Sequence, residues 1–171
     1  MRSNSVLPES FYARDTVSVA RALLGKVLSN GVLHAPIVEV EAYLGLHDKA
    51  AHAAKGITPR TRVIFGPPGR SYVYLIYGIH HCLNITAQPD GTPGCVLIRA
   101  VQGISGPGRL TRAFQITLAH NALPVFDPAS PLTIHDHGLR PANILVTPRI
   151  GISKATNWPL RFLTQLPSPP Q

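Results

Sequence analysis

The chain has 171 residues, of which 44% are hydrophobic, and it carries a formal net charge of +8 at pH 7. This length and composition suit one domain with a full core and exclude a disordered chain, and no apolar run approaches the roughly 18 residues that cross a membrane. The positive charge favours an acidic partner, with nucleic acid ahead of a membrane surface or an acidic small molecule; the plain alternative is a lineage rich in Arg, Ala and Pro.

The first predicted elements are a helix and a pair of strands. Residues 1–10 are expected to form a frayed, flexible start. Asp15 or Thr16 can cap a helix over residues 17–24, which Gly25 would end. A strand over residues 26–29 then leads through the Asn30-Gly31 turn into a longer strand that reaches residue 42, with Pro36 at a bulge or an edge.

The longer strand carries two carboxylates on one side. Strict alternation places Glu39 and Glu41 on one face together with Ile37, and the apolar residues Val38, Val40 and Ala42 on the other. One interpretation is an ordinary half-exposed strand. The other is an active site in which one carboxylate faces a cleft while the other is held by a cation or by N–H groups.

Residues 46–70 are predicted to be a long loop, with a short helix capped by Asp48 that ends near residue 54. The string Thr58-Pro59-Arg60-Thr61-Arg62 combines a hydroxyl, a fixed φ and two guanidinium groups, which together can bind a phosphate. Gly66-Pro67-Pro68-Gly69 is a rigid turn, and it lacks the lysine of a phosphate-binding loop.

A β-hairpin is predicted from strands over residues 71–77 and 82–87, joined by residues 78–81. Tyr72 and Tyr74 share one face with Ile76, whereas Tyr77 and Ile79 lie at or near the tip. β-propensity alone explains any one of these tyrosines. A large ring at an exposed tip is unusual for a monomer unless the ring enters a partner.

Residues 94–101 read as a buried strand with one charge, Arg99, for which Glu39 and Glu41 are the expected partners. Residues 105–114 read as a capped short helix, whose start beside Arg109 either binds phosphate or is simply well capped. Short strands are predicted at residues 132–135, 144–146, 150–152 and 160–162, followed by a flexible tail from about residue 165. We therefore expect an α+β (mixed α/β) fold: one compact domain over residues 1–171, with a curved, largely antiparallel sheet, a protruding hairpin and flanking short helices.

Several kinds of catalysis lack candidates in this sequence. His135-Asp136-His137 is the nearest approach to a metal-binding pattern, and it lies in a turn-like context before Gly138. No Gly-x-Ser-x-Gly string exists, and Cys82 and Cys95 lie in apolar runs that suit buried free thiols of a reducing compartment. What remains is a carboxylate, an arginine beside it, stacked tyrosines and a basic surface, which is the set that base flipping requires.

Further strings occur in an order and spacing that chance explains poorly. They are Glu39-Val40-Glu41-Ala42-Tyr43-Leu44-Gly45, Ala51-His52, Thr58-Pro59-Arg60-Thr61-Arg62, Tyr72-Val73-Tyr74-Leu75-Ile76-Tyr77-Gly78, Asn84-Ile85, Val96-Leu97-Ile98-Arg99-Ala100, Ser105-Gly106-Pro107-Gly108-Arg109-Leu110 and Pro159-Leu160-Arg161-Phe162. In these strings the sequence resembles the 3-methyladenine (alkyladenine) DNA glycosylase family over most of residues 15–162.

The resemblance implies a monofunctional glycosylase that needs no cofactor or metal and flips alkylated or deaminated purines out of double-stranded DNA. Glu41 matches the general base that activates water, and Arg99 and the main-chain carbonyl of Ile150 match groups that hold this water. The base pocket would comprise Tyr43, His52, Tyr74, Asn84 and Leu97, where Asn84 matches the group that excludes the 2-amino group of guanine. The residues expected to contact DNA are Tyr77, as the side chain inserted into the duplex, with Ile79, His80, Thr58, Arg60, Arg62 and Arg109.

Two departures from the family affect the expected substrate range. The connection between Ala100 and Ser105 is much shorter than in many members, and the tip reads Ile79-His80-His81 where a bulkier apolar pair is common. We expect a monomer inside the cell, in the cytoplasm or at the nucleoid if bacterial and in the nucleus if eukaryotic. The alternative function is a non-catalytic damaged-DNA-binding protein with the same pocket.

Overall fold

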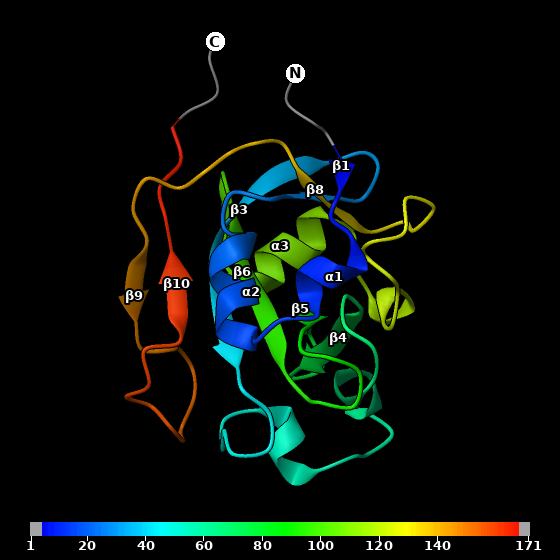
Figure 1. Cartoon of the computed structure of the whole chain (residues 1–171), viewed down its shortest axis with the longest axis vertical. Coiled ribbons are helices and arrows are strands. Elements are labelled where there is room, and N and C mark those ends of the chain that lie inside the picture. Colours follow the sequence, from blue (N-terminus) through cyan, green and yellow to red (C-terminus); the bar gives the residue numbers. More distant parts are fainter. Residues whose placement is uncertain (1–4, 168–171) are drawn as a thin grey trace.

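The computed structural model describes residues 5–167, and within them ten strands form one antiparallel sheet (Figure 1). The main strand order is β1-β8-β2-β3-β6-β5-β4, β7 pairs with β6, and β10 pairs with both β3 and β9. The strands are β1 (Ser5–Val6), β2 (Val27–Ser29), β3 (His34–Tyr43), β4 (Ser71–Ile76), β5 (His80–Thr86), β6 (Cys95–Val101), β7 (Ile104–Ser105), β8 (Thr133–Asp136), β9 (Leu145–Thr147) and β10 (Arg161–Leu163).

The helices are short, as expected, and they flank the sheet. They are α1 (Glu9–Tyr12), α2 (Thr16–Leu23) and α3 (Pro107–Ala113), with 3-10 turns η1 (His52–Lys55), η2 (Arg62–Phe65) and η3 (Leu118–His120). Helix α2 packs on β3 and β6, and α3 packs on β5 and β6 (Figure 1). This arrangement confirms the predicted mixed α/β class with a largely antiparallel sheet.

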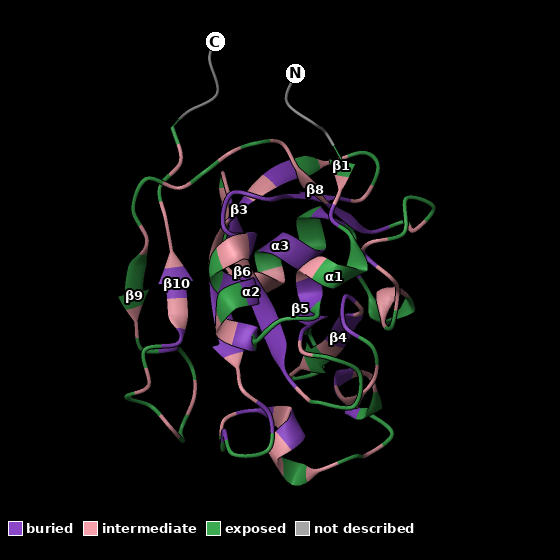
Figure 2. Cartoon of the chain, viewed as in Figure 1, coloured by how far each residue is buried: buried purple, intermediate pink, exposed green. Residues whose placement is uncertain are grey.

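The sheet separates two hydrophobic clusters. The larger cluster lies between the sheet and the helices, where α2 contributes Val19, Ala20 and Leu23 and β3 contributes Val40 and Ala42 (Figure 2). The smaller cluster contains Ala53, Ile64, Tyr72 and Cys95, packed with Tyr43, Val63, Phe65 and Tyr74 under η1 and η2. Since side chains alternate along a strand, this second cluster occupies the other face of β3, β6 and β4.

Several local predictions are confirmed. Asp15 caps α2, because its Oδ1 accepts the N–H of Ser18 at 3.0 Å. The hairpin of β2 and β3 turns over residues 30–33, where the Asn30 N–H donates to the Leu33 carbonyl at 3.2 Å, and β4 and β5 form the second predicted hairpin. Its tip is a tight turn closed by the N–H of Ile79 on the carbonyl of Ile76. No helix among residues 5–167 is both long enough and apolar enough to cross a membrane.

Other local predictions differ from the structure. Residues 5–10, expected to be frayed, form β1 and the start of α1, because β1 pairs with β8; residues 1–4 and the tail from 168 lie outside the described residues. Asp48 does not cap a helix, since η1 begins only at His52. Residues 150–152 form no strand, because the backbone N–H of Ile150 bonds a side chain and Gly151 has a φ of +72°.

Candidate active site

The register of the central strands aligns several of the predicted site residues in one row. Tyr72 on β4 lies opposite Asn84 on β5, Asn84 lies opposite Leu97 on β6, and Leu97 lies opposite Glu41 on β3. Residues directly opposite each other in a sheet point to the same face. The row therefore connects the tyrosines of β4 to the carboxylate of β3 across the face of the smaller cluster.

Two bulges interrupt the pairing of β3 with β6 beside this row. Between Ile37 and Glu39, β3 advances by two residues while β6 advances by one; between Glu39 and Val40 the opposite occurs, which leaves Arg99 as the extra residue of β6. A bulge redirects the side chains next to it. The bulge between Ile37 and Glu39 also explains why Ile37 is buried in the larger cluster with Val40. The prediction that Ile37 shares the face of the two glutamates is therefore wrong.

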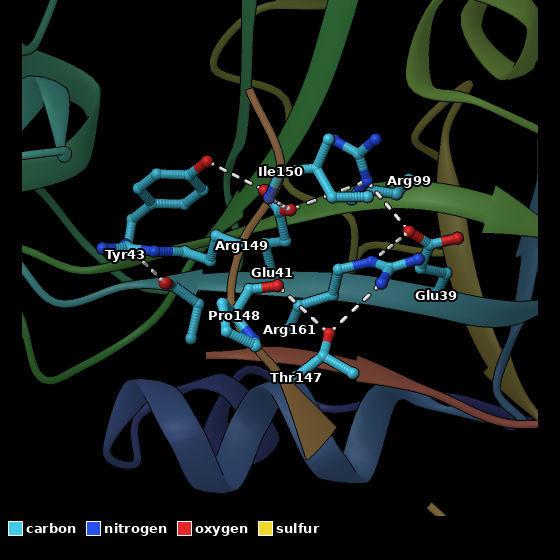
Figure 3. Close-up of polar contacts among 10 residues, drawn as sticks. Glu39, Glu41, Tyr43, Arg99, Thr147, Pro148, Arg149, Ile150 and Arg161 are labelled. Atoms are coloured by element: carbon cyan, nitrogen blue, oxygen red, sulfur yellow. Dashed lines mark hydrogen bonds and ion pairs between the residues drawn. The ribbon is translucent and has the colours of Figure 1, made fainter. Parts of the chain in front are cut away.

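Glu41 is fully buried and has donors on both carboxylate oxygens (Figure 3). Its Oε1 accepts the backbone N–H of Ile150 at 2.7 Å and lies 3.7 Å from Nε of Arg99. Its Oε2 accepts the hydroxyl of Tyr43 at 2.9 Å. These contacts offset the cost of burying a carboxylate. Burial and the nearby Glu41 raise the pKa of Tyr43 well above its usual value, so its hydroxyl stays protonated and acts as the donor.

Arg99 pairs with both glutamates, as predicted. Its Nε donates to Oε1 of Glu39 at 3.0 Å, and the same oxygen accepts Nε of Arg161 at 2.7 Å. Arg161 was not predicted as a site residue, since its only signal in the sequence is its place in a matching string. Its role depends on the pairing of β10 with β3, which places Arg161 opposite Glu41.

A buried ion pair fixes the segment that contacts Glu41. The guanidinium of Arg149 binds both oxygens of Asp48, at 2.5 and 2.9 Å, and also the carbonyl of Ala42 at 3.0 Å. Burial alone raises the pKa of Asp48, but the hydrogen bonds from Arg149 and from the N–H of Leu44 outweigh it and hold this pKa below its usual value. Sequence reasoning missed this pair, because its partners are 101 residues apart.

Three aromatic rings form the opposite side of the site. The His52 and Tyr74 ring centroids are 4.5 Å apart, those of Tyr72 and Tyr74 are 5.4 Å apart, and Nδ1 of His52 bonds the Tyr72 hydroxyl at 2.7 Å. Burial, then the charges of Arg60 and Lys55, lower the pKa of His52 to about 4, so the imidazole is neutral at pH 7. The rings of His52 and Tyr74 contact each other.

Buried residues of β5 and β6 lie between these two sides. Asn84 and Leu97 are both buried, and the Asn84 amide donates to the Tyr72 carbonyl at 3.2 Å. Cys82 and Cys95 are buried free thiols, as expected. Burial raises the pKa of Cys95 to about 12 and also raises the pKa of Cys82, so neither supplies a thiolate nucleophile.

The hairpin tip and α3 bring another predicted group together. Tyr77 is 91% exposed and Ile79 is 71% exposed. Behind the tip, a Cβ on Gly108 would lie 3.2 Å from the His80 ring, and the Thr111 hydroxyl donates to the His81 carbonyl. Helix α3 therefore supports the hairpin, and the exposed Arg109 follows directly after Gly108.

The loop over residues 58–62 presents two exposed arginines, Arg60 and Arg62. The Arg60 guanidinium lies 5.0 Å from the centre of the Tyr74 ring. The Thr58 hydroxyl accepts the N–H of Thr61 at 3.1 Å, so it already has a structural role in this turn. Beside them lies a hollow of about 360 Å³ lined by Pro59, Arg60, Tyr72, Val73, Tyr74, Leu75, Leu118 and Asn121.

The His135-Asp136-His137 triplet lies at and just after the end of β8, which is next to the opposite end of the strand order from β4. Asp136 pairs with Lys26 at 2.8 Å and with Arg140 at 2.9 Å, and chiefly the Arg140 contact holds the pKa of Asp136 below its usual range. Among residues 5–167, no group of three or more His, Cys, Asp or Glu side chains is placed to hold a metal ion.

A buried carboxylate with fixed donors lies on the same sheet face as several aromatic rings, an arrangement suited to chemistry on a flat ring system. Comparison with known proteins is more specific: the family model "Methylpurine-DNA glycosylase (MPG)" matches residues 10–105 and 102–167. The chain belongs to the methylpurine-DNA glycosylase family.

Individual relatives agree with this assignment. A protein of Sodalis glossinidius is 44% identical over 95% of this chain and 98% of its own length. One from Wolbachia pipientis wMel is also 44% identical, over 95% of this chain and 93% of its own length. One from Anaeromyxobacter dehalogenans is 47% identical over 91% of this chain and 80% of its own length. All three carry the name "Putative 3-methyladenine DNA glycosylase".

Proposed function

We propose that this chain is a monofunctional DNA glycosylase that removes alkylated or deaminated purines from double-stranded DNA and leaves an abasic site. The observation that carries the proposal is the buried Glu41, held by Tyr43 and Ile150 beside Arg99 and facing the rings of His52 and Tyr74. Membership of the glycosylase family supports the class of reaction.

The proposed reaction is a hydrolysis with a single displacement at the sugar. The flipped base stacks between rings, and an N-alkylated purine, being cationic, is attracted to neutral Tyr and His faces. The water oxygen forms a bond to C1′ as the C1′–N bond breaks, and the electron pair of the C1′–N bond leaves with the base. Glu41 accepts the proton of the water. Arg99 and the Ile150 carbonyl hold the water, while the Ile150 N–H holds Glu41.

One feature of the free protein must change when DNA binds. Glu41 is 0% exposed, so water reaches it only when a covering group moves. Insertion of Tyr77 into the duplex, with Arg60, Arg62 and Arg109 on phosphates, would supply binding energy for this change.

We expect no strand cleavage, because the proposed reaction assigns no lysine as a nucleophile. Lyase chemistry requires an amine that forms a Schiff base with the sugar. Lys26 is paired with Asp136 on β8, and Lys49, Lys55 and Lys154 are exposed, so none of the described lysines has the desolvated setting that activates an amine. We therefore expect abasic duplex to remain intact in the presence of the protein.

The proposal is tested with methylated duplex DNA in chelator, with the released bases quantified by chromatography. We expect the parental protein to release methylated purines, and Glu41→Gln to lose release by at least about 100-fold while still binding. Asp136→Asn is the matched control, because it removes a carboxylate that also contacts cations but lies on β8. Binding without release from methylated, deaminated or etheno-modified duplexes would identify the non-catalytic alternative.

A further inference from the structure

Two arginines meet on one oxygen of Glu39, a residue that the proposed reaction does not use. Oε1 of Glu39 accepts Nε of Arg99 at 3.0 Å and Nε of Arg161 at 2.7 Å. The three side chains are only 14 to 19% exposed. Charges buried to this extent need fixed partners, and replacing one of them changes how the others pair.

Only one nitrogen of the Arg99 guanidinium contacts the two glutamates. Its Nε is closer to Glu39 than to Glu41, at 3.0 against 3.7 Å. Its two terminal amino groups have no hydrogen-bond partner within residues 5–167, and Figure 3 shows them directed away from both carboxylates. Glu39 thus occupies one nitrogen of Arg99 and leaves the other two available.

Contacts from Glu39 also lead back to Glu41 by a second route. Nη1 of Arg161 donates to the Thr147 hydroxyl at 3.2 Å, and Thr147 lies three residues before Ile150 (Figure 3). The Ile150 N–H is the shortest hydrogen bond to Glu41, at 2.7 Å. Glu39 therefore contacts Arg99 directly and the Ile150 segment through Arg161.

We propose that Glu39 is a positioning residue: it holds Arg99 so that the terminal nitrogens face the reacting water and the flipped nucleotide instead of closing on Glu41. This inference rests on the proposed function. A guanidinium without Glu39 would pair with Glu41 through two nitrogens, the geometry that arginine and carboxylate favour. That pairing would occupy the carboxylate oxygen that must accept the water proton.

The test is single-turnover base release from a lesion-containing duplex, with duplex affinity measured in parallel. We expect Glu39→Gln to lower the rate of release roughly 10- to 30-fold and to change the affinity by less than about twofold. Glu39→Asp keeps the charge and should restore part of the rate. Asp136→Asn again serves as the control, since Asp136 also accepts from two cations and lies outside the site.

A double-mutant cycle with Arg99→Gln separates positioning from general destabilisation. If Glu39 acts through Arg99, adding Glu39→Gln to Arg99→Gln lowers the rate by less than about twofold further. A full multiplicative loss in that background, or a parental rate for Glu39→Gln alone, would overturn the inference. Should Glu39→Gln not fold, Glu39→Asp gives the same test with a smaller loss that also disappears in Arg99→Gln. An inactive parental protein would instead refute the proposed function itself.

Discussion

At the scale of single residues, Tyr43 and His52 combine an aromatic face with a polar group that already has a partner. The Tyr43 hydroxyl donates to Glu41, and Nδ1 of His52 bonds the Tyr72 hydroxyl. The polar atoms are therefore satisfied in the free protein, and the Arg149 guanidinium lies over the Tyr43 ring at 4.6 Å from its centre. Both residues could be predicted from the sequence by family resemblance, but their partners could not, because hydrogen bonds depend on side-chain directions.

His52 makes a pH-dependent contribution to stability that can be measured. In the folded protein the pKa of His52 lies at about 4, mainly through burial, whereas an unfolded histidine has its ordinary value near 6.5. Between these values the unfolded chain binds the additional proton, so the free energy of unfolding falls as pH decreases from about 6.5 to 4. Relative to His52→Asn, the parental protein should lose stability across this window and change little above pH 7. Urea unfolding at several pH values checks this, and a constant difference across the window would contradict it.

The ion pair of Arg149 and Asp48 is a part of the site that could not be predicted from the sequence. Each is ordinary in its local context, and only the fold brings them together in a buried pair. Glu39, Glu41 and Arg99 were predictable as partners, because a charge inside an apolar strand pattern needs an opposite charge and few acidic residues are available. The same argument did not reach Arg149, because this residue lies between the predicted strands at residues 144–146 and 150–152, where a charge needs no buried partner.

At the scale of elements, the tip of the β4–β5 hairpin carries backbone strain next to its exposed ring. Tyr77 has a φ of +53° and Gly78 a φ of +65°. A bulky residue in this conformation costs on the order of 1 kcal/mol relative to glycine. A strained, exposed aromatic residue at a tip is consistent with retention for binding rather than for stability.

Tyr77→Gly should therefore stabilise the fold and weaken its binding to duplex DNA. We expect the free energy of unfolding to rise by up to about 1 kcal/mol, and release of lesion bases to fall more on duplex than on single-stranded DNA. Thermal unfolding and base release on both substrates provide the measurements. Gln115→Gly is the matched control, because Gln115 is also exposed and has a φ of +54°. It should gain similar stability without losing duplex activity; an equal loss for Tyr77→Gly on both substrates would remove the insertion role.

Strand positions were largely predictable from the sequence, whereas strand register was not. The hairpins followed from Asn30-Gly31 and from the alternation between Ser71 and Ala87. The bulge at Arg99 depends on how β3 and β6 are paired, and the sequence of one strand does not determine which residues of another strand lie opposite it. The predicted strand over residues 150–152 was wrong for the same reason, because the Ile150 N–H donates to Glu41 and not to a neighbouring strand.

At the scale of the whole molecule, the arginines near the hairpin tip and the Asp136–Arg140 pair lie toward opposite ends of the sheet. β4, with the hairpin tip, is at one end of the strand order, and β8, with the Asp136–Arg140 pair, is next to the other end. The residues that make up the net charge of +8 are therefore not equally available for binding DNA. Arg60, Arg62 and Arg109 belong to the end with Tyr77, whereas Arg140 already has a carboxylate partner.

Salt dependence distinguishes local phosphate contacts from a general attraction of the basic protein to DNA. Each phosphate neutralised by an arginine contributes about −0.9 to the slope of log affinity against log salt. If Arg60, Arg62 and Arg109 each bind one phosphate, the slope should be roughly −2.7 or steeper, and Arg62→Ala or Arg109→Ala should each reduce its magnitude by about 0.9. Arg140→Ala removes the same formal charge at the far end of the sheet and should leave the slope unchanged. Fluorescence anisotropy over a salt series measures all four proteins, and an equal change for Arg140→Ala would mean that net charge, not the surface around Tyr77, controls binding.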